Sequence, residues 1–207
     1  MEKRSTQLSI SMLNGYSTVF MKINSLSILF DPLEIAPDQY DVDLVIVTHE
    51  HMDHFDKNLV MEISWQTNAV VLTTPYVARL LNGLANVVSL KPGDFYTINE
   101  VNIFAEDSNH TANDPLTFIV KSSDIAVFHP NDSDYFPELE AIGIKYKPDV
   151  MIYMGSSERN LRAIGFAVRP KIIVSYAHPM LKELAVPNIK VKALKQFEWF
   201  HYPDETT

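Results

Sequence analysis

Three histidines and one aspartate lie within six residues of this 207-residue chain, in the run His-Glu-His-Met-Asp-His at residues 49–54. Alternate residues of an extended segment point to the same side, so His49 and His51 can bind one metal ion together. The turn that follows brings Asp53 and His54 to a second position beside the first. Because imidazole mixed with carboxylate suits zinc, manganese or iron, the run predicts a site for such ions.

Three further candidate ligands each follow an apolar stretch of the chain: His110, Asp132 and His178. Taken singly, each of these residues would more often be a turn or cap residue. Their shared position beyond a predicted strand favours a common site, because strand ends along one edge of a sheet converge on one cleft. We therefore expect all three side chains to meet residues 49–54.

Runs of branched and aromatic residues, separated by turn residues, predict strands along most of the chain. They cover residues 7–12, 18–23, 27–30, 43–47, 69–72, 87–90, 101–104, 116–120, 125–128, 150–154 and 171–176. Helical patterns are expected over residues 59–65, 75–84, 135–142, 158–168 and 188–200. The last helix is inferred from Val191, Leu194 and Phe197, whose spacing would place them on one apolar face.

The order of these elements predicts an α/β fold. The continuous apolar run at residues 43–47, just before the histidines, is typical of a strand buried on both faces. Strands, β/α alternation, strands and β/α alternation follow one another, which indicates two similar halves. Two mixed β-sheets packed face to face, with helices on both outer faces (an αββα sandwich), would account for this order. No linker divides the chain, so we expect one domain over residues 1–207.

Composition limits the functions that this chain could have. Its apolar share of 46% is ordinary for a globular protein, and no stretch of about 18 apolar residues predicts a membrane span. The net charge of −9 would repel phosphate backbones, so we expect a small-molecule substrate and no nucleic acid. Cysteine is absent, which excludes disulfides and thiolate ligands and, with no signal-peptide pattern, favours a cytoplasmic location. Whether the chain forms a homo-oligomer stays an open question at this point.

At these residues the chain resembles the metallo-β-lactamase-fold superfamily, and most closely its short cytosolic hydrolases, which include the ascorbate-phosphate lactonases. The likeness extends from about residue 8 to residue 180. Besides the histidine run, it is carried by Leu29-Phe30-Asp31-Pro32, Lys91-Pro92-Gly93-Asp94, Lys147-Pro148-Asp149-Val150 and Arg169-Pro170-Lys171-Ile172-Ile173.

The resemblance implies a ligand set for two metal ions. It implies His49, His51 and His110 at one ion. It implies Asp53, His54 and His178 at the other ion, with Asp132 bridging the two. It also implies that Asp31 lies behind the ligands, where a carboxylate can orient an imidazole, although a turn residue ahead of Pro32 is an equal alternative.

The chain departs from the family pattern at two places near the predicted site. The family usually has a histidine after the glycine of its first loop, where this chain has Gly15-Tyr16-Ser17. It usually has glycine before the bridging aspartate, where this chain has Asn131, preceded by His129-Pro130. Asparagine tolerates left-handed backbone angles, so the turn can survive, but the substrate cannot be inherited from the family.

We interpret the site as that of a dinuclear metal-dependent hydrolase acting on a small ester, lactone or phosphoester. Two divalent ions, zinc or manganese by preference, would bridge a hydroxide that attacks a carbonyl or phosphorus. Asp53 would be the catalytic residue that orients this nucleophile or shuttles its proton. Asn14, Tyr16 and Arg159 are candidates for the substrate rim.

Two other classes of function stay open. A mononuclear iron oxygenase of this fold keeps the same histidine motif, whereas the di-iron kind typically replaces the second histidine with glutamate, and His51 argues against that kind. A non-catalytic metal-binding module of the same fold is the third alternative. Metal analysis would separate them, since bound iron with oxygen uptake would favour redox chemistry.

Overall fold

The computed structural model describes residues 7–178 and 186–203, whose strands form two sheets of seven strands each. Sheet A contains, in spatial order, β14 (Trp199–Tyr202), β1 (Leu8–Met12), β2 (Val19–Ile23), β3 (Leu26–Phe30), β4 (Leu44–Val47), β5 (Val70–Thr73) and β6 (Val87–Ser89). Sheet B contains β13 (Lys190–Leu194), β12 (Ile172–Tyr176), β11 (Val150–Tyr153), β10 (Ala126–His129), β9 (Leu116–Lys121), β8 (Val101–Asp107) and β7 (Phe95–Ile98).

The two sheets repeat one pattern of strand directions. In sheet A, neighbouring strands from β14 to β3 are antiparallel, and those from β3 to β6 are parallel. In sheet B, neighbouring strands from β7 to β10 are antiparallel, and those from β10 to β13 are parallel. This repetition matches the two similar halves expected from the sequence.

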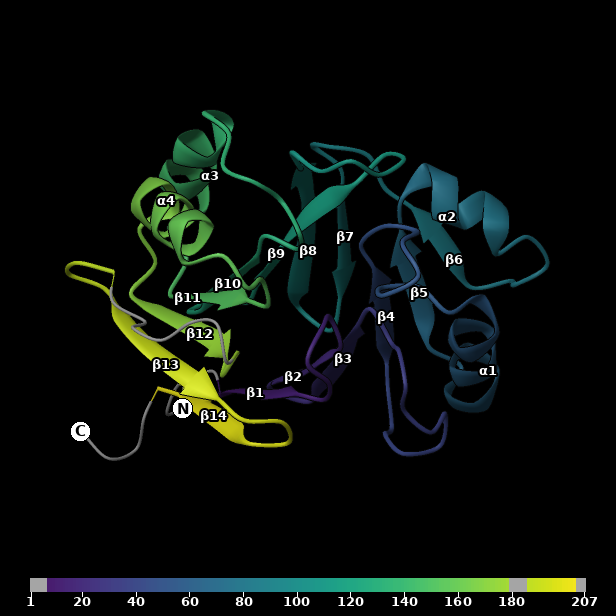
Figure 1. Ribbon diagram of the computed structural model, residues 1–207. Helices are drawn as coiled ribbons and strands as arrows, with labels where there is room; N and C mark the ends of the chain where they lie inside the picture. The colour runs from purple at the N-terminus through teal and green to yellow at the C-terminus, as the bar shows by residue number, and fades with distance from the viewer. Residues whose placement is uncertain (1–6, 179–185, 204–207) are drawn as a thin grey trace.

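Helices cover the outer faces of both sheets. Parallel neighbours need a crossover connection, and α1 (Lys57–Thr67) and α2 (Pro75–Leu80) supply it in sheet A. In sheet B the crossovers are α3 (Glu138–Tyr146) and α4 (Glu158–Val168). Figure 1 shows α1 and α2 at one side of the molecule and α3 and α4 at the other, with the sheets between them. The expected αββα sandwich is therefore confirmed.

The strand before the histidine run, β4, is buried on both faces as expected. Leu44 and Ile46 belong to the core between the sheets, whereas Val45 and Val47 pack among the residues beneath α1. All four side chains are buried. The end of β4, from which residues 48–54 start, is therefore held from both sides.

A helix cap fixes the point at which the histidine run ends. The side chain of Asp56 accepts hydrogen bonds from the backbone N–H groups of Asn58 (2.9 Å) and Leu59 (3.1 Å). This is the usual N-cap arrangement, and it starts α1 three residues after His54. The run thus lies between a buried strand and a capped helix, both of which restrict its conformation.

The predicted helix over residues 188–200 is wrong, because the chain forms β13 and β14 there. Exposed Lys190 and Lys192 alternate with less exposed residues, which is the two-residue period of a strand. Leu194 belongs to the core between the sheets, whereas Val191 packs on the other face of sheet B, toward the helices. The spacing of these two residues was interpreted as one helical face, but they point to opposite sides.

Smaller differences concern the ends of elements. Helix α2 stops at Leu80 rather than at residue 84, and α3 starts at Glu138 rather than at residue 135. Pro137 explains the later start, because the residue before a proline is disfavoured in the helical region. Strand β7 was not predicted. In the part of the chain that the structure describes, no helix is long and apolar enough to cross a membrane.

Candidate metal centre

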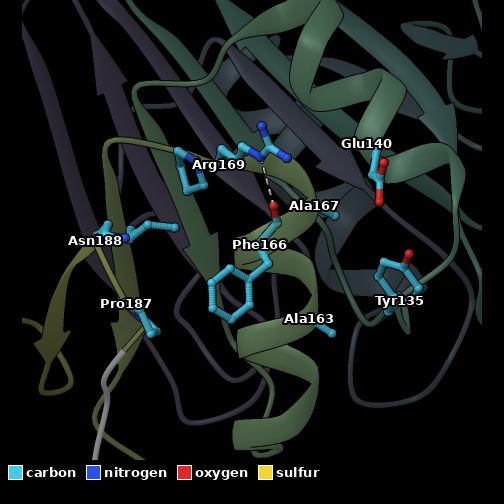
Figure 2. A pocket seen from close by; sticks show the side chains of 10 residues that line it. Tyr135, Glu140, Ala163, Phe166, Ala167, Arg169, Pro187 and Asn188 are labelled. Carbon is cyan, nitrogen blue, oxygen red and sulfur yellow. Dashed lines mark hydrogen bonds between the residues drawn. The ribbon is translucent and has the colours of Figure 1, made fainter.

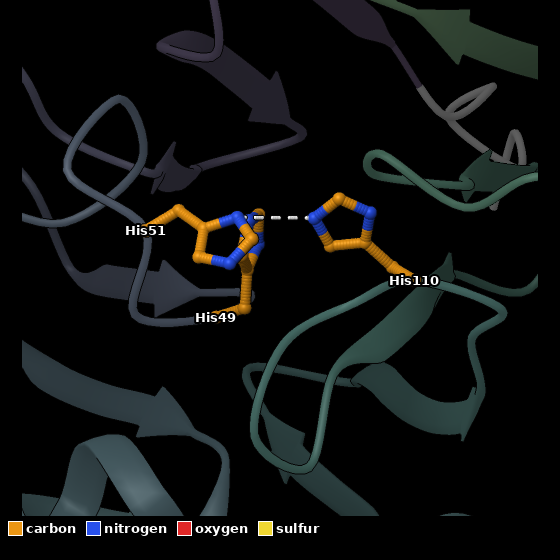
Figure 3. A group of neighbouring side chains, drawn as sticks. All are labelled: His49, His51 and His110. Atoms are coloured by element: carbon orange, nitrogen blue, oxygen red, sulfur yellow. Dashed lines mark hydrogen bonds between the residues drawn. The ribbon is translucent and has the colours of Figure 1, made fainter.

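Side chains from both sheets meet beyond the end of β4. The ligand atoms of His49, His51 and His110 lie within 4.8 Å of one another, and so do those of His49, His54 and Asp132. His110 comes from the loop between β8 and β9, and Asp132 from the loop between β10 and α3. Figure 3 shows the ring of His110 facing those of His49 and His51. Five of the seven predicted ligands are therefore brought together.

A buried carboxylate lies behind this cluster. Asp31 has no exposed surface, and its Oδ1 accepts a hydrogen bond from the backbone N–H of Thr48 at 2.7 Å. Its Oδ2 accepts the Thr48 hydroxyl at 2.7 Å and lies 2.8 Å from Nδ1 of His54. The backbone of Asp31 is left-handed, with φ of 43°. Asp31 is therefore bonded to the cluster and is more than a turn residue ahead of Pro32.

This hydrogen bonding fixes the tautomer of His49. Thr48 has a single hydroxyl proton, which goes to Asp31, so Thr48 Oγ1 can only accept from His49 Nδ1 at 3.1 Å. The Nδ2 atom of Asn131 lies 3.2 Å from the same Nδ1 while its Oδ1 is buried without a partner among the described residues, so we assign the amide turned over, with its oxygen also accepting from Nδ1. Nδ1 of His49 thus carries the proton, and Nε2 keeps its lone pair. That Nε2 atom is buried and has no hydrogen-bond partner among the described residues. An unpaired buried lone pair beside two other imidazoles fits a metal ligand.

The charge state of His49 agrees with this role. Burial, together with the nearby positive charge of His54, lowers the pKa of His49 to about 4. Burial likewise lowers the pKa of His110 below its ordinary value. Both rings are therefore neutral at pH 7, which is the state that binds metal ions.

The tautomer of His51 is fixed from outside the cluster. Its Nε2 lies 3.1 Å from the backbone oxygen of Thr111, and since a carbonyl only accepts, Nε2 carries the proton. Its Nδ1 then keeps a lone pair and lies 3.1 Å from Nε2 of His110. In the metal-free protein this lone pair accepts from Nε2 of His110, so the three rings direct ring nitrogens toward one point, where an ion would replace that proton.

His54 lies between two carboxylates. Its Nδ1 contacts Asp31 at 2.8 Å and its Nε2 contacts Asp132 at 3.1 Å. Burial lowers the pKa of His54, but the hydrogen bonds that its ring donates to Asp132 and Asp31 outweigh this effect and raise the pKa to about 10. Burial also raises the pKa of Asp132, while the hydrogen bond from His54 outweighs it, so the pKa of Asp132 is below its ordinary value. Asp31 and Asp132 thus favour positive charge at this position, which His54 carries in the metal-free protein; to act as a ligand, His54 would exchange its Nε2 proton for the metal ion.

The departure at Asn131 keeps the turn that glycine would make. Asn131 has a left-handed φ of 57°, and its backbone N–H donates to Nδ1 of His129 at 3.0 Å. His129 stacks on Phe30 with ring centroids 4.8 Å apart. Complete burial lowers the pKa of His129 to about 4, so this ring is neutral at pH 7. The unusual pair His129 and Asn131 therefore supports the loop that carries Asp132.

Among residues 7–178 and 186–203, two predicted ligands, Asp53 and His178, belong neither to the group of His49, His51 and His110 nor to the group of His49, His54 and Asp132. Asp53 is exposed, and its backbone oxygen accepts the Ser17 hydroxyl at 2.6 Å. His178 is half-buried, and its backbone N–H donates to the oxygen of Tyr176 at 2.8 Å. The assignment of Asp53 and His178 as ligands stays a prediction.

The candidates for the substrate rim differ in exposure. Asn14 is buried, and its Oδ1 accepts the backbone N–H groups of Tyr16, Ser17 and Thr18, each at 3.0 Å. Its side chain therefore organises the loop that presents Tyr16, which is 49% exposed. Arg159 is exposed in the first turn of α4. Contact of any of these residues with a substrate stays a prediction.

Two cavities differ in their relation to the cluster. One of about 620 Å³ lies beside α4 and is lined by residues such as Tyr135, Phe166 and Arg169, but by no candidate ligand (Figure 2). Another of about 520 Å³ is lined partly by Ser108 and Asp114, from the loop that carries His110. Among the described residues, no candidate ligand lines the second cavity either, but it shares with the candidate centre the loop that carries His110.

Sequence reasoning missed the groups that hold the ligands. Thr48 lies directly between the buried strand and the first histidine, and a hydroxyl at that position was the available signal. The backbone oxygen of Thr111 gave no signal, because every residue has one. Glu50 and Asn113, which bond to each other, are ordinary polar residues in the sequence.

Three kinds of comparison with known proteins each give a likeness. A model described as the beta-lactamase superfamily domain matches residues 11–154. A "UPF0173 metal-dependent hydrolase" of Caldivirga maquilingensis is 27% identical, with 91% of this chain and 96% of that protein covered. The solved structure of Igni18, a novel metallo hydrolase from Ignicoccus hospitalis, has a TM-score of 0.78 and 22% identity, covering 95% of this chain and 99% of that one.

A more distant structure has a different chemistry. CmlA, a diiron beta-hydroxylase from Streptomyces venezuelae, has a TM-score of 0.63 and 14% identity, covering 84% of this chain and 45% of that one. Likenesses to solved structures at such low identity establish the fold alone. The solved structures therefore do not decide between hydrolytic and redox chemistry.

Proposed function

The chain belongs to the beta-lactamase superfamily and is a metal-dependent hydrolase, and we propose that it works with two divalent ions, zinc or manganese by preference. His49, His51 and His110 would hold one ion. His54, Asp53 and His178 would hold the other, with Asp132 between the two. The observation that carries this proposal is the unpaired, buried Nε2 of His49, which points a lone pair into a cluster of imidazoles.

The metal ions would supply one part of the chemistry. Bound together, such ions lower the pKa of a shared water toward about 7 and polarise a substrate oxygen. The protein supplies the rest. Thr48 fixes the tautomer of the His49 ring, and Asp31 orients the ring of His54, which would bind a metal ion only after losing its Nε2 proton.

Asp53 is our proposed catalytic residue. It directly precedes His54, its side chain is exposed, and its backbone oxygen is held by the Ser17 hydroxyl. A carboxylate at this point can orient the attacking water, take up its proton and return that proton to the leaving group. Replacement of Asp53 by asparagine should therefore slow the reaction more than it weakens substrate binding.

We propose a small ester, lactone or phosphoester as the substrate. The cavity of about 520 Å³ beside the loop of His110 has the size of a small-molecule site. Lys91 lines the same cavity and could pair with an anionic group of the substrate. The net charge of −9 supports a small substrate over a nucleic acid, and we propose a cytoplasmic location for the reaction.

A hydrolysis screen tests the proposal. Protein loaded with zinc or manganese would be assayed against phosphodiesters, lactones and esters, beside a His54→Ala variant and a His201→Ala control from β14. We expect the His54→Ala variant to lose activity and at least one metal ion, and the control to keep both. Full metal content and full activity in His54→Ala would refute the site. Bound iron with oxygen uptake in the purified wild type would favour the oxygenase alternative.

A further inference from the structure

Glu50 lies in the histidine run, but its carboxylate is not in either group of candidate ligands. It bonds instead to Asn113, in the loop that carries His110. We infer that Glu50 and Asn113 form a clasp that holds His110 in position beside His49 and His51. The inference rests on the proposed function, because it assigns a positioning residue to the three-histidine group. Glu50 and Asn113 are together called the Glu50–Asn113 clasp below.

The clasp consists of three short contacts to one carboxylate. The backbone N–H of Asn113 lies 2.9 Å from Oε1 and 3.2 Å from Oε2 of Glu50. The side-chain Nδ2 of Asn113 donates to Oε1 at 2.6 Å. Hydrogen bonds to a charged acceptor are roughly twice as strong as neutral ones. Both oxygens of Glu50 are engaged, which explains why this carboxylate belongs to neither close group of candidate ligands.

The clasp joins two loops that start from different sheets. Glu50 follows β4 of sheet A, whereas Asn113 lies three residues after His110, between β8 and β9 of sheet B. Their separation in sequence is 63 residues. The contact therefore ties together the two halves of the three-histidine group, which the two sheets supply separately.

The loop of His110 is anchored just before that residue, but the part after His110 has fewer links. The backbone N–H of Asn109 donates to Ser133 Oγ at 2.9 Å, its oxygen accepts from Asp134 N–H at 2.9 Å, and its Nδ2 donates to the Tyr135 oxygen at 3.3 Å. Thr111, Asn113 and Asp114 are exposed, and residues 108–115 contribute no side chain to the buried apolar clusters of the described chain. Besides the clasp, two backbone oxygens link the part of the loop after His110 to the histidine run. The Thr111 oxygen lies 3.1 Å from Nε2 of His51, and the Thr48 oxygen accepts from Leu116 N–H at 3.3 Å. A segment with few buried contacts opens readily, so polar links decide where it rests.

The position of the clasp also connects it to the tautomer of His51. The Thr111 oxygen that fixes the proton on His51 Nε2 lies one residue after His110 and two before Asn113. Without the clasp, the Thr111 oxygen is no longer held at hydrogen-bond distance from Nε2 of His51. The proton of the His51 ring can then lie on either nitrogen. The clasp thus controls two ligands of one ion, His51 and His110, without touching the ion.

Four variants test the clasp: Glu50→Ala, Asn113→Ala, the double variant and the conservative Glu50→Gln. Glu62→Ala, which removes an exposed carboxylate from α1, is the matched control. Zinc binding would be measured by competition with a chromophoric chelator. We expect Glu50→Ala and Asn113→Ala each to weaken one zinc site about 10- to 100-fold and to leave the other unchanged, as for other groups that orient metal ligands. The double variant should be no worse than either single one, and Glu50→Gln should recover part of the affinity.

A second readout needs no metal ion. Nitrogen-15 NMR of the metal-free protein at pH 8 reports which ring nitrogen of His51 carries the proton. We expect the proton on Nε2 in the wild type and Glu62→Ala, and a mixture of tautomers in Glu50→Ala. Unchanged zinc affinity at both sites with an unchanged His51 tautomer in Glu50→Ala and Asn113→Ala would overturn the clasp. A wild type that binds no zinc while the tautomer still responds to these variants would overturn the proposed function instead.

Discussion

Oδ2 of Asp31 lies 2.8 Å from Nδ1 of His54, and both groups are almost completely removed from solvent. The same oxygen accepts the hydroxyl of Thr48, which in turn faces the ring of His49. One buried carboxylate therefore orients a candidate ligand from each of the two proposed metal positions. This arrangement leads to predictions about stability as well as about metal binding.

Replacing Asp31 by alanine should destabilise the metal-free protein by about 3–5 kcal/mol, because it leaves His54 as a buried charge without this partner. Chemical denaturation at pH 7 measures the change in the free energy of unfolding. Asp41→Ala, which removes an exposed carboxylate, should stay within about 0.5 kcal/mol of the wild type. Equal stability of the two variants would contradict the role given to Asp31.

Replacing Thr48 by valine should weaken zinc binding about 10- to 100-fold with little change of side-chain volume, because the hydroxyl that fixes the His49 tautomer is lost. Chelator competition measures the affinity. Thr73→Val is the matched control, since Thr73 is also buried and its hydroxyl donates to the backbone oxygen of Val47 at 2.9 Å, away from the histidines. Equal affinity of Thr48→Val and Thr73→Val for zinc would count against the relay from Asp31 to His49.

His129 should make the stability of the metal-free protein depend on pH. Burial lowers its folded-state pKa to about 4, below the ordinary value of 6.5, so only the unfolded chain takes up this proton between the two values. The contribution of His129 is thus complete above pH 6.5 and falls as the pH drops toward 4. At about 1.4 kcal/mol per pKa unit, the loss is roughly 3 kcal/mol.

A His129→Phe variant tests this dependence. Phenylalanine retains the stacking on Phe30 but cannot be protonated. Free energies of unfolding measured from pH 7 to pH 4.5 should fall less steeply for the variant than for the wild type. Parallel curves would mean that His129 does not titrate as its burial requires. His49 and His54 stay unchanged in both proteins, so the difference between the curves isolates His129.

Asn131 should tolerate glycine better than alanine. Both substitutions remove the side-chain amide, but only glycine adopts φ of 57° without steric cost. We expect Asn131→Gly to be more stable than Asn131→Ala by about 1 kcal/mol in chemical denaturation. The same stability for both variants would show that this backbone position carries no strain.

Much of the fold and of the site could be predicted from local sequence. Strand β4 is recognisable because its apolar run is continuous, and the α/β order of the remaining elements follows from turn residues and periodicity. His49, His51, His54, His110 and Asp132 were placed together because each follows a strand. These signals lie within a few residues of the group that they predict.

The failures have long-range causes. Strands β13 and β14 were predicted as one helix, although β14 exists only through its pairing with β1, where Ser11 lies opposite Trp199. The Glu50–Asn113 clasp likewise joins residues that no local pattern connects. The ligand roles of all seven candidates stay predictions, although the structure brings five of them together, and so does the single domain over residues 1–207.

The pairing of β14 with β1 has a consequence for synthesis on the ribosome. Strand β1 emerges first but stays an unprotected edge until Trp199 has left the exit tunnel, because its outer neighbour lies near the other end of the chain. Such an edge can recruit a strand from another chain. A nascent chain stalled before residue 199 should therefore aggregate through sheet A, even though its histidine run is already complete.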